Sequence, residues 1–190
     1  MYELVGTTGN GTINSNGTGP LVLTGDVVSD ATGTSQFILS GTNTGNNTFS
    51  GEIQENTGTG ITAFTKSGTS LWILPRSNGY LGTSTISGGT LRMQVNGALG
   101  QGTNLVISGT TTKLLLAPTA GDITLTQAIT ISNNSISTGV IQSANGNNVI
   151  DSTITISGTA LTRYQADAGS TLTYAGSPAF AQATQTVVFQ

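Results

Sequence analysis

Short clusters of apolar residues recur along the whole chain, each separated from the next by threonine, serine, asparagine or glycine. Alternation of one apolar with one polar residue is clearest over residues 123–126, 129–131 and 153–156. Successive residues of a β-strand face opposite sides, so this pattern predicts strands with aliphatic side chains inside and threonine outside. No stretch repeats apolar residues at i, i+3 and i+4 as an amphipathic helix would. The chain is therefore expected to be all-β.

A recurring tripeptide indicates how these strands are arranged. The chain carries Ile86-Ser87-Gly88, Ile107-Ser108-Gly109, Ile131-Ser132-Asn133 and Ile156-Ser157-Gly158. The first residues of successive tripeptides are 21, 24 and 25 residues apart. Upstream, Leu39-Ser40-Gly41 and Phe64-Thr65-Lys66 extend the rhythm at offsets of 25 and 22. A period in the low twenties with one such corner per period is typical of a solenoid. We predict a parallel β-helix, or β-solenoid, of about eight rungs stacked at about 4.8 Å, formed by residues 1–190 as one domain; a β-sandwich is the alternative.

Three segments carry a family likeness. Residues 65–74, 77–91 and 96–100 read TKSGTSLWIL, SNGYLGTSTISGGTL and NGALG. This series resembles the passenger-associated repeat of autotransporters, although Ser70 stands where that repeat has glycine, and Pro75-Arg76 where it has Ser-Gly. The resemblance implies a right-handed β-helical stalk exported to the bacterial surface, of which this chain would be an excised or processed piece.

The likeness is good over about residues 35–110. A second, poorer copy of the repeat is expected at residues 37–43 and 47–51, where Phe37 would correspond to Trp72.

Charge is scarce, and this limits the available chemistry. The 190 residues include 27 glycines, but only five lysines and arginines against eight carboxylic acids, a net charge of −3 at pH 7. The absence of histidine and cysteine excludes a catalytic triad with histidine, a cysteine nucleophile and ordinary zinc sites. Five dispersed cations disfavour nucleic acid as a partner, and no apolar run approaches the about 20 residues of a membrane-spanning helix. The composition favours a folded, exported chain at an extracellular or cell-surface location, with no cofactor.

The carboxylates are the candidates for catalysis, because enzymes that cleave glycosidic bonds use paired acids. They are Glu52 with Glu55, Asp26 with Asp30, and the single residues Asp122, Asp151 and Asp167. Glu52 and Glu55 are three residues apart in a turn-like segment and should not share a strand face. Residues 26–30 offer too few oxygens for a calcium site. We therefore expect solvated charges, no catalytic or metal-binding residue, and a protein that is not an enzyme.

Outward threonines are the next candidate for binding. Pairs that would lie on one side of a strand are Thr124 and Thr126, Thr153 and Thr155, and Thr171 and Thr173. The sequence offsets between these pairs, 29 and then 18, are irregular. We therefore expect ordinary outer strand residues rather than an ice-binding array.

Aromatic residues at strand positions are expected to stack inside the core rather than to form an exposed glycan-binding row. They are Phe37, Phe49, Phe64, Trp72 and Tyr80. Tyr164 and Tyr174 lie in a more polar segment and are expected to be exposed.

The ends of a β-helix carry unpaired N–H and C=O groups, which can pair with another copy head to tail and form filaments. Neither end of this chain has a charged or proline-rich cap, and its alanine-rich residues 175–183 are expected to form a last rung or an added strand before Thr186. The first hypothesis is a structural, non-catalytic extracellular stalk or filament segment that self-associates. The alternative is an adhesin-type binding module whose threonine- and asparagine-rich faces hold glycan, a host surface or ice.

Overall fold

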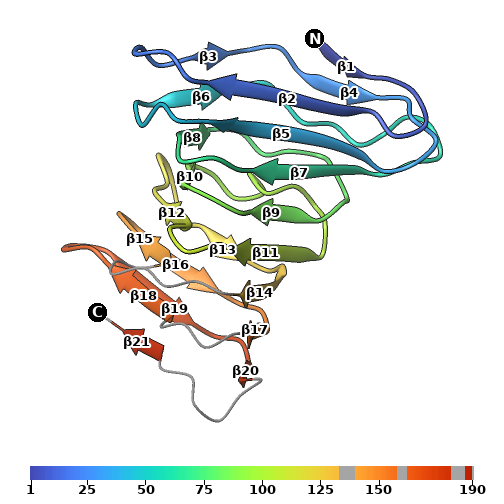
Figure 1. Cartoon of the computed structure of the whole chain (residues 1–190). Coiled ribbons are helices and arrows are strands. Elements are labelled where there is room, and N and C mark those ends of the chain that lie inside the picture. Colours follow the sequence, from blue (N-terminus) through green and yellow to red (C-terminus); the bar gives the residue numbers. More distant parts are fainter. Residues whose placement is uncertain (133–139, 158–161, 181–186, 190) are drawn as a thin grey trace.

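The computed structural model describes residues 1–132, 140–157, 162–180 and 187–189, and only the backbone of residues 178–180 and 187–189. All regular secondary structure in these residues is β-strand, and all strand pairs are parallel. The strands stack from the N-terminal end, at the top of Figure 1, to the C-terminal end at the bottom. The predicted class, an all-β parallel solenoid, is confirmed.

The solenoid has three sides, and the chain visits them in the same order in each turn. Sheet 1 contains, in spatial order, β2 (Asn10–Ser15), β5 (Ser35–Gly41), β7 (Thr62–Lys66), β9 (Ser84–Ile86), β11 (Asn104–Ser108), β14 (Ala128–Ser132), β17 (Ile154–Ser157) and β20 (Pro178–Phe180). Sheet 2 contains β3 (Val22–Leu23), β6 (Asn47–Phe49), β8 (Leu71–Leu74), β10 (Thr90–Met93), β12 (Lys113–Leu116), β15 (Ile141–Ser143), β18 (Thr162–Ala166) and β21 (Val187–Phe189).

The third side is less regular. It carries β1 (Tyr2–Leu4) paired with β4 (Val27–Ser29), and further along the axis β13 (Thr124–Leu125), β16 (Asn147–Ile150) and β19 (Thr171–Tyr174). Between these two small sheets the turns continue through a bridge from Val27 to Ile53 and through a hydrogen bond from Gly79 N to Ile53 O, 2.9 Å.

The solenoid makes about six turns, slightly fewer than the about eight rungs expected. Each long sheet has eight strands, and the six that lie between its two end strands are paired on both edges. In the described residues, β2 and β3 are the one-sided strands at the N-terminal end. Within the alanine-rich residues 175–183 the structure has β20, and β21 follows them, while residues 181–186 and 190 lie outside the described residues.

Aliphatic columns run through the interior of the C-terminal half, as the tripeptide predicted. The register places Ile86 beside Ile107, Ile107 beside Ile131, and Ile131 beside Ile156. All four side chains are buried. The alternation over residues 123–126, 129–131 and 153–156 is also confirmed, because the aliphatic residues there are buried and the threonines are not.

The register of the N-terminal half differs from the prediction. Leu39 pairs with Lys66 rather than with Phe64, and Lys66 in turn pairs with Ile86. Phe64 instead pairs with Phe37. The turn from position 39 to position 66 is therefore clearly longer than the turn from 66 to 86, and the proposed upstream offsets of 25 and 22 were wrong.

The proposed second copy of the repeat is not a structural repeat of the first. Phe37 lies in β5 of sheet 1, whereas Trp72 lies in β8 of sheet 2, so the two residues occupy different sides of the solenoid. The structural neighbours of Trp72 in its column are Asn47 and Leu91.

Candidate functional site

Glu55, a candidate acid, accepts hydrogen bonds from backbone N–H groups at a corner of the solenoid. Its Oε1 accepts hydrogen bonds from Asn56 N at 2.6 Å and Thr62 N at 2.7 Å, and its Oε2 accepts one from Leu81 N in the next turn. Glu52, the other acid of this candidate pair, makes none of these bonds. Glu55 therefore holds the corner that leads into β7.

The aspartates expected to be solvated divide into two groups. Asp26 and Asp122 each accept one backbone hydrogen bond from the adjacent turn, from Glu52 N at 2.8 Å and from Asn147 N at 2.7 Å. Asp30 and Asp151 are exposed at the ends of β4 and β16.

Asp26 and Asp30 do not converge on a cation, because they flank β4 and are separated by about 13 Å of extended chain. Among the described residues no three carboxylates, histidines or cysteines come close enough to hold a metal ion.

Asp167 is the candidate with the richest side-chain contacts. Its Oδ1 accepts hydrogen bonds from Gln142 Nε2 at 2.6 Å and Gln165 Nε2 at 3.1 Å. Gln142 Oε1 accepts a bond from Lys113 Nζ at 2.7 Å, so three turns are joined across the outer face of sheet 2. Partial burial lowers the pKa of Lys113, and the charge of Asp167 opposes that shift. The chain of contacts links amides to charges but contains no nucleophile paired with a base.

A buried lysine is the residue that sequence reasoning missed. Lys66 occupies the inward column of Leu39 and Ile86 and has no exposed surface. Its Nζ donates to three backbone carbonyls, those of Ser67 at 2.7 Å, Gly88 at 3.0 Å and Gly68 at 3.3 Å. Burial lowers the pKa of the Lys66 ammonium to about 8. Because Gly88 belongs to the following turn, the lysine ties two turns together at this corner.

The stability of the protein is expected to rise with pH because of Lys66. In the unfolded chain Lys66 keeps its proton up to about pH 10.5, whereas in the folded chain it loses it near pH 8. Above pH 8 the unfolded state therefore binds more protons, and the free energy of unfolding should rise by about 2 kcal/mol toward pH 10. Urea unfolding at about pH 7.5 and about pH 9.5 measures this rise.

Lys66→Met is the matched control, because it keeps a flexible chain of similar length and cannot titrate. Its unfolding midpoint should rise less over the same interval, and the rise that remains comes from Lys113, whose pKa partial burial also lowers. The buried Tyr80 and Tyr164 act in the opposite direction and at higher pH, because burial raises the pKa of each phenol. An equal rise in the wild type and in Lys66→Met would contradict the assignment to Lys66.

Buried asparagines join successive turns, a role that the sequence pattern did not reveal. Asn47 accepts a hydrogen bond from Leu21 N at 2.9 Å and donates one to Leu71 O at 2.8 Å. Asn78 accepts from Ile53 N at 2.7 Å and donates to Ala98 O at 2.6 Å. Each side chain thus replaces a strand hydrogen bond at a corner where the backbone bends. The side-chain amide makes these contacts, which a glycine at the same corner could not make.

The expected aromatic core row is confirmed, because all five side chains are at most 2% exposed. The ring centroids of Phe37 and Phe64 are 6.5 Å apart, and those of Phe64 and Tyr80 are 6.1 Å apart. Tyr80 shares a hydrogen bond of 2.7 Å with Ser84 Oγ.

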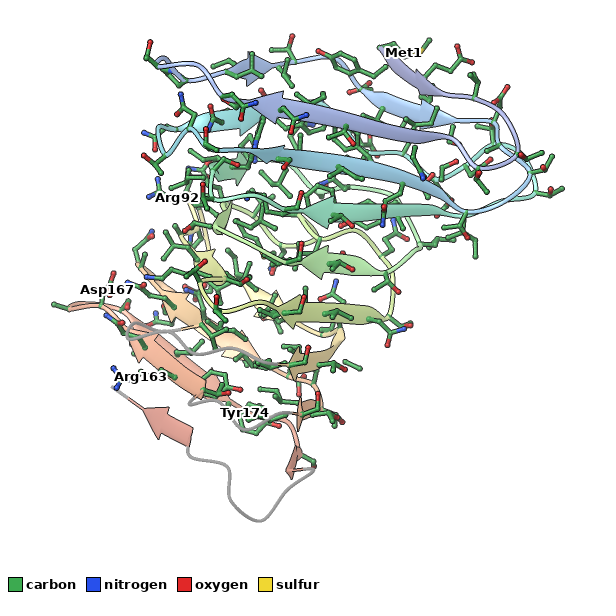
Figure 2. The ribbon with its side chains drawn as sticks, viewed as in Figure 1. Met1, Arg92, Arg163, Asp167 and Tyr174 are labelled. Carbon is green, nitrogen blue, oxygen red and sulfur yellow. The ribbon has the colours of Figure 1, made fainter. Side chains whose placement is uncertain are left out.

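The expectation for the other two tyrosines was wrong. Tyr164 is 5% exposed and belongs to the core, where it pairs with Ile141. Tyr174 is partly buried, packs against the core and donates its hydroxyl to Ser152 O at 3.2 Å. Their polar neighbours in sequence point outward instead, as Arg163 does in Figure 2.

The expected threonine pairs do not form one continuous array. Thr124, Thr171 and Thr173 lie on the third side, whereas Thr155 lies in sheet 1. A different outward column does form on sheet 1, and its aligned members are Thr12, Ile38, Thr65, Thr85, Val106, Thr130 and Thr155. No charged residue occupies an outward position in the described strands of this sheet.

No helix in the described part of the chain is long and apolar enough to cross a membrane. Comparison of the chain with protein-family models, with curated proteins and with solved structures found no match in any of the three.

Proposed function

We propose that this chain is a structural, non-catalytic segment of an extracellular or cell-surface protein, a rigid stalk that spaces or presents other domains. The observation that carries the proposal is the unbroken parallel ladder of two eight-stranded sheets around one apolar core. Such a body keeps its two ends at a fixed separation, because each turn is fixed by hydrogen bonds to the turn before it. The candidate acids Glu55, Asp26 and Asp122 support the same view, because they bond the backbone between turns.

End-to-end stacking is part of this proposal. The N-terminal turn presents the unpaired outer edges of β2 and β3, with Met1, Val5 and Val22 strongly exposed beside them. An exposed strand edge with apolar neighbours can add a strand from a second copy. Electron microscopy at high protein concentration should show fibres one solenoid wide, and uniform monomers would contradict the stacking.

Rigidity can be tested directly by a distance measurement. The chain has no cysteine, so Asn14→Cys with Ser157→Cys gives one pair of spin labels on a shared outward column of sheet 1. Six strand spacings separate the two positions. Double electron–electron resonance should therefore give one narrow distance peak at about 30 Å. The same pair in urea is the control and should give a broad distribution. A broad distribution under native conditions would overturn the stalk proposal.

A second candidate is a binding module, and the uncharged threonine column on sheet 1 favours it. A flat, neutral surface of β-branched residues suits glycan or ice better than it suits a charged partner. Thr130→Lys should abolish binding on a glycan array or in an ice-recrystallisation assay, whereas Thr173→Lys, exposed on the third side, should not. Absence of any signal from the wild type would count against this candidate.

A further inference from the structure

The three sides of the solenoid carry different charges. The outward positions of sheet 1 are neutral in its described strands. The outward positions of the sheet 2 strands carry Arg92, Lys113 and Arg163, and one acid lies on the same face, Asp167 just after β18, which accepts hydrogen bonds from Gln142 and Gln165. The third side and its corners carry seven of the eight acids, Glu3, Asp26, Asp30, Glu52, Glu55, Asp122 and Asp151. We call the outward residues of sheet 2 the cationic face and these seven acids the anionic side.

The cationic face also carries apolar side chains that point outward. In one column the register runs from Ile73 to Arg92 to Leu115, so the arginine lies between two aliphatic residues, which are only 7% and 9% exposed. In the neighbouring column, Leu71 is followed by Thr90 and Lys113. Figure 2 shows Arg92 and Arg163 at the same flank of the molecule.

We propose that the cationic face of one copy docks on the anionic side of a second copy of this chain. The charge complementarity lies within a single sequence: three cations on one side, with Asp167 as the acid beside them, meet seven carboxylates on another. The second copy is favoured over other occupants because its anionic side has the same strand spacing of about 4.8 Å as the face that it would cover. Asp30 and Asp151 are exposed on that side and can approach a partner without first breaking a hydrogen bond inside the solenoid.

The contact is weak and directional. The cationic face is about 34 Å long and about 13 Å wide, roughly 450 Å² per copy, below the about 800 Å² per partner of a stable interface. Docking is heterologous, because the two docked surfaces differ. A docked pair therefore keeps one free cationic face and one free anionic side, and further copies can add to form lateral bundles. The proposal rests on the structural function above and adds to it the surface through which stalks or filaments associate side by side.

Sedimentation equilibrium of the full chain at high concentration tests the docking. Association should weaken at least about tenfold between about 0.01 M and about 1 M salt, because the Debye length falls from about 30 Å to about 3 Å. Arg92→Gln with Lys113→Gln should lose the low-salt association. Asn104→Glu with Ala128→Glu is the matched control: it gives the same net charge, −3 − 2 = −5, but places the acids on sheet 1, and it should still associate.

Charge exchange provides the decisive outcome. Arg92→Glu with Lys113→Glu, and separately Asp30→Lys with Asp151→Lys, should each be monomeric at low salt, and an equimolar mixture of the two proteins should associate again. Urea midpoints close to that of the wild type establish that both variants are folded. Failure of the mixture to associate, or equal loss in the sheet 1 control, overturns the docking. Association that is insensitive to salt and retained in every variant also overturns the docking, and it indicates end-to-end stacking instead. The spin-label distance tests the stalk proposal independently of both outcomes.

Discussion

Replacing Trp72 with alanine is expected to lower the free energy of unfolding by about 4 kcal/mol. Trp72 has no exposed surface and lies in the inward column of sheet 2 between Asn47 and Leu91. Its Nε1 also donates to Ser40 O at 3.0 Å, which ties β8 to the end of β5 across the core. Alanine would leave a cavity in the middle of the solenoid and an unpaired carbonyl, and the neighbouring turns can close only part of the gap because their strands are held in register.

Urea unfolding followed by far-ultraviolet circular dichroism measures this loss, because Trp72 is the only tryptophan and its fluorescence disappears with it. Trp72→Phe keeps an aromatic ring but not the N–H donor, and should cost about 1–2 kcal/mol. Leu81→Ala is the surface control, since Leu81 is 54% exposed, and should change the stability by less than about 0.5 kcal/mol. A loss below about 1 kcal/mol for Trp72→Ala would contradict the burial of this side chain.

The strands could be predicted from the sequence because alternation is a local property. A strand with one face in the core must place every second residue inside, so Ile129 and Ile131 were assigned correctly without knowledge of their neighbours. The same rule contained the signal that was missed at Tyr164. Period two places Tyr164 on the face opposite Arg163 and Gln165, and the polar character of the segment described only the outer face.

The register of the N-terminal half could not be predicted, because turn lengths there are unequal. Lys66 pairs with Leu39 across a long turn and with Ile86 across a much shorter one. A lysine in an aliphatic column contradicts any pattern based on hydrophobicity, and a buried ammonium is tolerated only with several acceptors. The carbonyls that accept from Lys66 come from two turns, and one of them, Gly88 O, is 22 residues away in sequence.

The roles of the carboxylates could not be predicted either, because their hydrogen-bond partners are distant in the sequence. Glu55 binds backbone N–H groups seven and 26 residues further along the chain, at Thr62 and Leu81. The separation of charge between the sides also emerges only when turns are stacked, because acids that are dispersed in the sequence fall on one side once the turn length is known. Composition alone showed that charge was scarce but not that it was segregated.

Replacing Gly102 with valine is expected to lower the free energy of unfolding by about 3 kcal/mol. A Cβ at this position would overlap the carbonyl oxygen of Gly82 in the preceding turn, and that oxygen belongs to backbone that cannot rotate away. Glycine over glycine recurs at other corners, where Gly51 lies against Gly25 O and Gly60 against Gly33 O. The glycine content of the chain thus reflects close contact between turns as much as backbone conformation. A side chain at Gly102 must separate two turns in the middle of the ladder, where hydrogen bonds on both sides resist the movement.

Gly19→Val is the matched control, because no atom lies within 4 Å of a Cβ at Gly19 and its backbone does not require glycine. Urea midpoints of the two variants should therefore differ clearly, with Gly19→Val within about 0.5 kcal/mol of the wild type. Gly102→Ala should show most of the loss already, since the first carbon makes the clash and the two methyl groups of valine only add to it. Equal stability of Gly102→Ala and Gly19→Val would mean that successive turns are not in contact at this corner, and the stacking on which the stalk proposal depends would be wrong there.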